Sequence, residues 1–291
     1  MTRENEPVEH LTERDPATPR TVVITGSSSG IGLAAAEELA RRGWSVAIVG
    51  RSPDRLGKAL DRVRAAAGSR SDAAAPVTAY QCDFDELKQV RELAVSLRST
   101  YPRIDVLANN AGGILHGSTV DGFPSMMQAN HLAHFLLSHE LRDQLSGGRI
   151  INTASQAHTS GNLDPQHPWK QGSLMPMGDY GSAKQANILF TVEAARRWPE
   201  IISAAFHPGV VRTNFGSSNV VIGTFFKYWP FLRTPQRGAQ TLVWLASTDA
   251  SDIRSGAYYQ DMREVQPTAR ATDPTTAGML WESSLTAVGL T

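Results

Sequence analysis

Short, unbroken apolar runs alternate along this chain with longer segments whose apolar residues recur at helical spacing. The apolar runs predict strands at residues 21–25, 44–50, 77–82, 104–109, 149–154, 201–206 and 255–260. The helical spacing predicts helices at 30–42, from 53 onward, and at 85–101, 120–145, 180–198 and 236–247, the last being the final long helix. A strand that is apolar at every position is buried on both faces, as in a parallel sheet between two helical layers.

The regular alternation indicates one domain at residues 21–291, without a repeat or a linker. Right-handed crossovers between successive strands would give an α/β fold of the Rossmann type, a doubly wound parallel sheet with helices on both faces. Residues 1–20 are polar and rich in Glu, Thr, Arg and Pro, so we expect a disordered N-terminal tail. Two stretches interrupt the pattern: 156–178, which contains three prolines, and 214–234, which is rich in aromatic residues.

The composition excludes several classes of protein. The 291 residues include 28 basic and 28 acidic side chains, so no net field favours nucleic acid or an anionic membrane. Cys82 is the only cysteine, which excludes an internal disulfide and a cysteine metal cage. Residues 1–20 lack the apolar core of a signal peptide, and no apolar run reaches the roughly 18 residues of a membrane helix. We expect a soluble cytoplasmic protein without stable membrane insertion; homo-oligomerisation stays open.

A glycine-rich turn, TGSSSGIG from Thr25 to Gly32, follows the first predicted strand directly. Its spacing is G-x-x-x-G-x-G rather than the G-x-G-x-x-G of the commonest dinucleotide fold. Glycine permits a tight turn and close backbone approach, and the next helix presents its N-terminus to phosphate charge. Alone, the pattern could be a plain structural turn. Within this alternation and with the motifs below, it predicts a nicotinamide-cofactor site formed by Thr25, Gly26, Ser28, Ser29, Gly30, Ile31 and Gly32.

The end of the second predicted strand indicates which nicotinamide cofactor is preferred. Enzymes that use NAD usually have an acidic residue there for the ribose 2′-hydroxyl, whereas this strand ends at Arg51 with no carboxylate before Asp54. An arginine can pair with a 2′-phosphate, the alternative being a solvated surface side chain. Arg51 therefore predicts NADP(H), preferred over NAD(H). Further cofactor contacts are expected from Asp83, which could bond the adenine edge, cap the next helix or do both, and from Phe84, Asn110, Ala111 and Gly112.

A second motif lies far from the first in the sequence. Tyr180 and Lys184 are four residues apart in a predicted helix, so the phenol and the ammonium lie one above the other. A nearby ammonium favours the tyrosinate, so we expect Lys184 to lower the pKa of Tyr180 from its usual value of about 10. A Tyr-x-x-x-Lys pattern alone occurs by chance in many helices. Beside a nicotinamide site it predicts a tyrosine that moves a proton as general acid or base.

Together these motifs closely resemble the short-chain dehydrogenase/reductase family, from Thr21 to the C-terminus. TGSSSGIG, NNAG, a serine after the fifth strand, YGSAK and the His-Pro-Gly at 207–209 occur in the family's order. The segments NHLAHFLL at 130–137 and NTASQAH at 152–158 resemble the retinol dehydrogenase-like branch. So does the GAYY at 256–259 followed by LWE at 280–282.

The resemblance implies a catalytic tetrad of Asn130, Ser155, Tyr180 and Lys184. Ser155 would hydrogen-bond the substrate oxygen, Lys184 would also hold the nicotinamide ribose, and Asn130 would hold a water that links Lys184 to solvent. The nicotinamide pocket would include Pro208, Gly209, Val211 and Thr213. Two features depart from the common pattern. The 25 positions from Ser155 to Tyr180 are about twice the usual gap, as in the retinol-like branch, and Ala154 stands where relatives often have a second serine.

The sequence thus predicts an NADP(H)-dependent oxidoreductase that transfers a hydride between nicotinamide and a carbonyl/alcohol pair. The aromatic segment at about 213–234 would be a lid over a lipophilic small molecule. The alternatives for it are a helix pair on the core, a dimer contact or a weak membrane contact. Other functions share the motifs: a non-enzymatic NADP(H) sensor and a reductase of carbon–carbon double bonds, whereas a sugar epimerase fits less well because its glycine motif differs.

Three histidines, His131, His134 and His139, have a spacing that could suggest a metal site. No acidic residue or further ligand accompanies them in a known pattern, so we expect no metal. We expect these rings to pack along the helix or to reach solvent.

Overall fold

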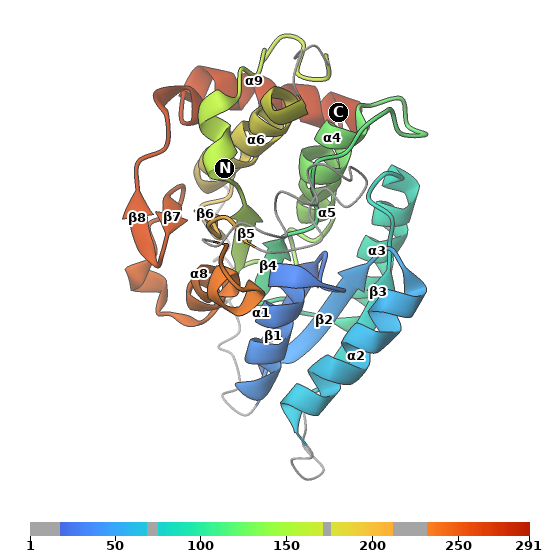
Figure 1. The fold of residues 1–291 in the computed structure, drawn as a ribbon. Coiled ribbons are helices and arrows are strands. Elements are labelled where there is room, and N and C mark those ends of the chain that lie inside the picture. The colour runs from blue at the N-terminus through green and yellow to red at the C-terminus, as the bar shows by residue number, and fades with distance from the viewer. Residues whose placement is uncertain (1–17, 69–74, 171–175, 212–231) are drawn as a thin grey trace, which may run out of the picture.

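An eight-stranded sheet lies at the centre of the molecule, with helices on both faces (Figure 1). The computed structural model describes residues 18–68, 75–170, 176–211 and 232–291. Within them the strand order is β3-β2-β1-β4-β5-β6-β7-β8, and all neighbours are parallel except β7 with β8. The strands are β1 (Thr21–Thr25), β2 (Ser45–Gly50), β3 (Val77–Gln81), β4 (Val106–Asn109), β5 (Arg149–Thr153), β6 (Ile202–His207), β7 (Tyr258–Gln260) and β8 (Arg263–Val265).

The strand order runs outward from β1 in both directions, so the direction of the crossovers reverses between β1 and β4. Doubly wound sheets bind ligands at such a switch point, beyond the carboxyl ends of the strands. The predicted α/β fold with a doubly wound parallel sheet is therefore confirmed. The carboxyl ends of β1, β4 and β5 are where the motif residues should meet.

Alternating side chains of the central strand pack against different helical layers. Val22 and Ile24 lie with α1, α2 and α8, whereas Val23 lies with α3, α5 and α6, and all three side chains are fully buried. Burial on both faces explains why this strand is apolar throughout. The helices are α1 (Gly30–Arg41), α2 (Pro53–Ala67), α3 (Leu87–Thr100), α4 (Ser125–Met127), α5 (Ala133–Glu140), α6 (Pro176–Arg197), α8 (Pro235–Ser247) and α9 (Pro274–Ala287).

The helix predicted at residues 120–145 is shorter and interrupted. Residues 117–124 form a small hairpin instead, closed by a hydrogen bond of 3.0 Å from Ser125 N to Gly117 O. The helix begins at Ser125 and continues as α4, a π-helical turn at Gln128–Leu132, and α5. A π turn holds an extra residue, and π turns occur frequently at functional sites.

Two elements were not predicted. The expectation that residues 236–247 form the final long helix is wrong, because α9 follows and packs on α6. β8 turns back on β7 through Asp261 and Met262, which both have positive φ angles of 51° and 62°. Positive φ at both central residues is the geometry of a type I′ hairpin turn.

The predicted tail and lid lie mostly outside the described residues, which include only 18–20 of the first and 232–234 of the second. The two flanks of the lid segment are joined. Val211 and Arg233 form a parallel bridge, and Arg233 N donates to Val210 O at 2.8 Å. The Arg233 guanidinium also pairs with both carboxylate oxygens of Asp261 at 2.5 and 2.9 Å.

Candidate active site

The four residues of the predicted tetrad come from three elements that meet beyond the carboxyl ends of β4 and β5. Ser155 follows β5, Tyr180 and Lys184 lie on α6, and Asn130 lies on the π turn before α5. Tyr180 and Lys184 are 7% and 3% exposed, and Asn130 is fully buried. The structure therefore brings together residues that are up to 54 positions apart in the sequence.

Ser155 is held at the start of a 3₁₀ turn, Gln156–Ser160. Its hydroxyl accepts a hydrogen bond of 3.2 Å from Ala157 N and also hydrogen-bonds the side chain of Tyr180. The backbone carbonyl of Ser155 lies 2.7 Å from Nδ1 of His158, which must be the donor because a carbonyl only accepts. The serine is thus fixed by its neighbours and is in direct contact with the tyrosine.

Lys184 lies on the same face of α6 as Tyr180, as predicted. Its Nζ is 5.5 Å from the centre of the Tyr180 ring and donates to Thr153 O at 3.1 Å. Burial disfavours the ammonium and lowers the pKa of Lys184 to about 7. Lys184 can therefore gain or lose a proton near neutral pH.

The expected lowering of the Tyr180 pKa is not found. Burial raises the pKa of Tyr180 above its usual value, and the hydrogen bond from Ser155 opposes this only in part. The physical reason is that burial of the phenol disfavours the tyrosinate, and burial also lowers the pKa of Lys184 to about 7, so its ammonium is only partly populated at neutral pH. Tyr180 is accordingly a protonated phenol at neutral pH.

Asn130 is engaged on every side of its amide. Nδ2 donates to Gly113 O at 2.9 Å and to Met126 O at 2.8 Å, while Oδ1 accepts from Gly113 N at 3.1 Å. A Cβ added at Gly112 would lie 2.2 Å from Asn130 Oδ1 and 3.6 Å from Lys184 Nζ, so both atoms border the same small space. The two amide hydrogens are already used; only Oδ1 retains capacity, as a second acceptor site for a water.

The glycine turn packs against the loop after β4 at distances that leave no room for a side chain. A Cβ on Gly26, whose φ is +65°, would lie 2.7 Å from Ala111 Cα, and one on Gly32 would lie 2.6 Å from Asn110 Nδ2. Ser29 is the N-cap of α1 but makes no side-chain cap, and the first turn has no acidic residue. The first N–H groups of α1 therefore have no side-chain acceptor, which suits a phosphate anion. Of the remaining predicted residues, Thr25 ends β1, Ser28 lies in the turn, and Gly30 and Ile31 begin α1.

Asn110 and Ala111 are tied to this turn through Thr25. Thr25 Oγ1 accepts from Asn110 N at 2.8 Å and from Ala111 N at 2.9 Å, and Asn110 Nδ2 donates to Thr25 O at 2.9 Å. The predicted cofactor residues after β1 and after β4 therefore form one connected surface.

Arg51 is exposed and lies beside two carboxylates. Its Nη1 is 3.7 Å from Asp83 Oδ2 and 3.9 Å from Asp85 Oδ2, and burial together with Asp83 raises the pKa of Asp85. Asp83 does not cap α3: Glu86 is the N-cap residue, and Leu87 N donates to Asp121 at 2.9 Å. The capping alternative for Asp83 is therefore wrong, because its Oδ1 instead accepts from Asp85 N at 3.1 Å.

The segment after β6 borders the glycine turn. Gly209 has a φ of +82°, and a Cβ there would lie 2.5 Å from Arg233 Nε. Val211 reaches α8 where Gly238 leaves room, beside Ile31. Pro208 is buried, and Thr213 lies outside the described residues.

The three histidines of the π turn and α5 are buried or packed against aromatic rings. His131 Nε2 is 3.0 Å from Ser284 Oγ, and His139 packs against Trp198 and Trp281. His134 lies between Thr25 and Asn130, with Phe84 at its edge. Among the described residues, no three His, Cys, Asp or Glu side chains are grouped as a metal site would require.

Sequence reasoning missed two further residues at the site. The hydroxyl of Tyr258 is buried and has no hydrogen-bond partner among the residues that the structure describes, and this side chain lies close enough to Tyr180 to affect its pKa. Asp85 was missed although it follows the end of β3, which pairs with β2 beside Arg51. Position at a strand end was the available signal for Asp85.

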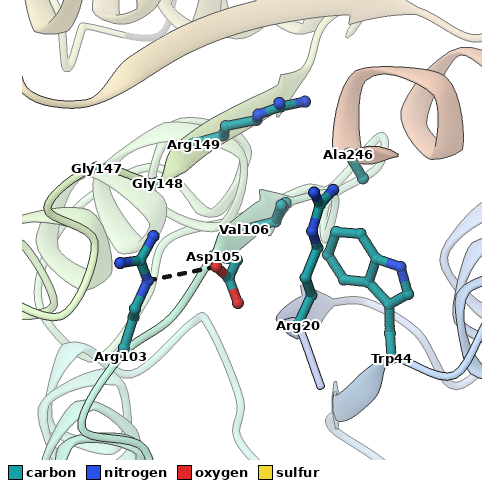
Figure 2. A pocket seen from close by; sticks show the side chains of 9 residues that line it. All are labelled: Arg20, Trp44, Arg103, Asp105, Val106, Gly147, Gly148, Arg149 and Ala246. Carbon is teal, nitrogen blue, oxygen red and sulfur yellow. Dashed lines mark ion pairs between the residues drawn. The ribbon is translucent and has the colours of Figure 1, made fainter. Parts of the chain in front are cut away.

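A pocket of about 190 Å³ lies at the opposite end of the sheet, where β4 and β5 begin (Figure 2). Its arginines are occupied by protein groups. Arg149 donates to Leu245 O and Thr248 O at 2.6 Å, Arg103 pairs with Asp105, and Arg20 covers the ring of Trp44. The side chains of this pocket therefore join β5 to α8 and the residue that follows it, at the end of the sheet remote from Tyr180.

Comparison with known proteins agrees with the geometry. A family model for short chain dehydrogenase matches residues 20–220. A provisionally named daunorubicin C-13 ketoreductase of Streptomyces sp. (strain C5) is 46% identical over 278 residues, 93% of each chain. Human retinol dehydrogenase 13 is 33% identical over 286 residues, covering 93% of this chain and 85% of that protein.

Solved structures share the fold. An uncharacterized protein from Mycobacterium paratuberculosis has a TM-score of 0.73 and 29% identity, with 94% of both chains covered. A short-chain dehydrogenase from Sphingobium yanoikuyae in complex with NADPH has a TM-score of 0.62 and 25% identity, with 78% of this chain and 84% of that chain covered. Among the described residues, no helix is long and apolar enough to cross a membrane. With its glycine turn, its Ser-Tyr-Lys cluster and these relatives, the chain belongs to the short-chain dehydrogenase/reductase family of oxidoreductases, in the retinol dehydrogenase-like branch.

Proposed function

We propose that this protein is an NADP(H)-dependent reductase that converts a carbonyl group on a lipophilic small molecule to an alcohol. The observation that carries the proposal is the buried contact between Ser155 and a protonated Tyr180, with Lys184 on the same helix face. A protonated phenol can donate its proton to a carbonyl oxygen, which is the role that carbonyl reduction requires.

The chain's own groups would divide the work as follows. The hydroxyls of Ser155 and Tyr180 would both hydrogen-bond the substrate oxygen, and Tyr180 would give that oxygen its proton. NADPH, when bound, supplies the hydride for the carbonyl carbon. Proton donation leaves a buried tyrosinate, which an ammonium on Lys184 would stabilise. The pKa of Lys184, about 7, allows it to hold that proton at or below neutral pH.

The glycine turn and the open N-terminus of α1 would hold the pyrophosphate. We infer that Arg51 binds the 2′-phosphate, while Asp83 and Asp85 hold its guanidinium at the end of β2. These carboxylates also repel a phosphate, so the preference for NADP(H) over NAD(H) should be moderate. The side-chain exposure of 58% at Arg51 points the same way, because exposed ion pairs are weak.

The substrate class rests on similarity. The 46% identity to the daunorubicin ketoreductase supports a bulky ketone on an aromatic framework, and the similarity to retinol dehydrogenases supports an apolar one. Both fit an enzyme of lipophilic carbonyl compounds.

The test is the loss of NADPH absorbance, alongside NADH, across aromatic ketones, aliphatic aldehydes, quinones and enones, with identification of the products. We expect turnover that prefers NADPH and gives alcohols, and we expect Tyr180→Phe to bind NADPH as the wild type does but to have no turnover. Saturated ketones from the enones would identify a double-bond reductase instead. Tight NADPH binding without any turnover would favour the sensor.

A further inference from the structure

We propose that His134 is a positioning residue that couples the cofactor turn after β1 to the π turn that carries Asn130. The proposal rests on the proposed function for its catalytic consequence, but the coupling itself is a property of this chain's hydrogen bonds. His134 is 2% exposed and contacts both elements: Nε2 is 3.1 Å from Thr25 Oγ1, and Nδ1 is 3.1 Å from Asn130 O.

The direction of these two bonds follows from their partners. Asn130 O is a backbone carbonyl and can only accept, so Nδ1 of His134 must carry the hydrogen. Burial lowers the pKa of His134 to about 3, so the ring is neutral and has a single N–H. Nε2 is therefore bare, and it accepts from the hydroxyl of Thr25.

This assignment also completes the bonding of Thr25. Once its hydrogen points to His134, the two lone pairs of Oγ1 face the amides of Asn110 and Ala111, at 2.8 and 2.9 Å. The competing acceptor for the hydrogen, Ala108 O, is 3.2 Å away. In this orientation a single hydroxyl bonds both His134 and the loop after β4.

The other end of the same loop is held by Asn130. Its side chain bonds both the N–H and the carbonyl of Gly113, while its backbone carbonyl receives the N–H of His134. The hydrogen bonds therefore close a ring that runs from Thr25 through the 110–113 loop to Asn130, and back through His134 to Thr25. Gly112, in the middle of this loop, borders Lys184 Nζ.

Because the hydrogen bonds form a closed ring, the 110–113 loop and the π turn are held relative to each other. The 110–113 loop is predicted to contact the cofactor, and the π turn is predicted to supply protons towards Lys184. His134 is the member that joins the two, so its loss should loosen both ends at once. A histidine that only filled space would resemble His139. Its Nε2 has no hydrogen-bond partner in the described part of the chain, and its ring packs on Phe135, Trp198 and Trp281.

Three substitutions separate the two bonds of the ring. His134→Leu removes both. His134→Asn places an amide N–H near the position of Nδ1 and should keep the bond to Asn130 O, whereas His134→Gln places its amide near Nε2 and should keep the bond to Thr25. His139→Leu is the control, since it removes a half-buried histidine from the same helix without touching the ring of hydrogen bonds.

The first measurement is hydrogen exchange of the peptide that covers residues 108–114, in the protein without cofactor. We expect exchange in His134→Leu to be about tenfold faster than in the wild type, the scale of one lost hydrogen bond, and unchanged in His139→Leu. The second measurement is the NADPH dissociation constant together with kcat on the best ketone of the panel. His134→Leu should lose about tenfold in each, His134→Asn should recover kcat, and His134→Gln should recover NADPH affinity.

Exchange in folded His134→Leu that matches His139→Leu would overturn the proposal. So would losses of kcat and affinity that neither Asn nor Gln restores separately. If the wild type turns over no carbonyl substrate, the proposed function fails, and the exchange measurement still decides whether His134 couples the two turns.

Discussion

Lys184 should destabilise the folded protein at neutral and acidic pH, so Lys184→Met should make it more stable. Burial lowers the pKa of Lys184 from the ordinary 10.5 to about 7. Below pH 7 the folded state must carry a buried ammonium, at a cost of about 4–5 kcal/mol for this shift. Met has a similar length and no charge, although its introduction leaves Thr153 O without the hydrogen bond of 3.1 Å from Nζ, which offsets about 1–3 kcal/mol.

The sign of the pH dependence follows from proton binding. Between about pH 7 and 10.5 the unfolded chain holds a proton on Lys184 and the folded chain does not, so stability rises with pH. The advantage of Lys184→Met over the wild type should be about 1–4 kcal/mol near pH 6 and should fall by about 3 kcal/mol towards pH 9.5.

The assay is urea unfolding without cofactor, followed by fluorescence, at several pH values between 6 and 9.5. Lys88→Met is the matched control, because the side chain of Lys88 is 85% exposed and its substitution should give no such trend. A Lys184→Met protein that is less stable than the wild type at pH 6, or an advantage that does not shrink as the pH rises, would refute the reasoning. Carbonyl reduction should be lost in this variant in either case.

Two further changes test the cofactor end. Gly112→Ala should destabilise by about 2–4 kcal/mol in the same urea assay, because residue 112 has a φ of +138° and the new Cβ would meet Asn130 Oδ1 at 2.2 Å. Gly113→Ala meets nothing within 4 Å and should be nearly neutral, so equal losses would contradict the role of that contact. Asp85→Asn should strengthen NADPH binding more than NADH binding and should stabilise the protein at neutral pH. The pKa of Asp85 is raised on folding, so the cost of its charge grows as the pH rises above 3.8 and is absent in acid. Titration calorimetry with NADPH and NADH measures both affinities. Arg51→Ala should instead weaken NADPH binding more than NADH binding.

The fold was largely predictable because the central strands are buried on both faces. The run at residues 21–25 reads as a strand in any context, since nothing polar interrupts it, and it matches β1 residue for residue. β8 could not be read in this way, because Arg-Glu-Val is three residues long and its first two side chains are exposed. α9 could have been predicted, because an Asp followed by a Pro is a typical helix start. In the structure the Asp273 side chain caps the helix by accepting from Thr276 N.

At the site too, local spacing was predictable from the sequence, whereas features that depend on tertiary contacts were not. Motif spacing placed Tyr180 and Lys184 on one helix face, which the structure has. Spacing carries no information on burial, and burial is what raises the pKa of Tyr180 rather than lowering it. The partners of His134 were not predictable either, because Thr25 lies 109 positions away on another element.

The contact between the two residues that border the predicted lid segment, Val211 and Arg233, has a consequence for how substrate preference could change. Val211 and Arg233 form a parallel bridge, Arg233 N donates to Val210 O, and Asp261 on the β7–β8 turn accepts two hydrogen bonds from the Arg233 guanidinium. Val211 and Arg233, which border the segment, are therefore held side by side whatever the number of residues between them. When the two ends of a segment are held together, doubling its length costs only about 0.6 kcal/mol. We therefore expect the fold to tolerate a longer, shorter or unrelated segment between Val211 and Arg233. Recombination or design could exchange it while the sheet, the glycine turn and the Ser-Tyr-Lys cluster stay intact.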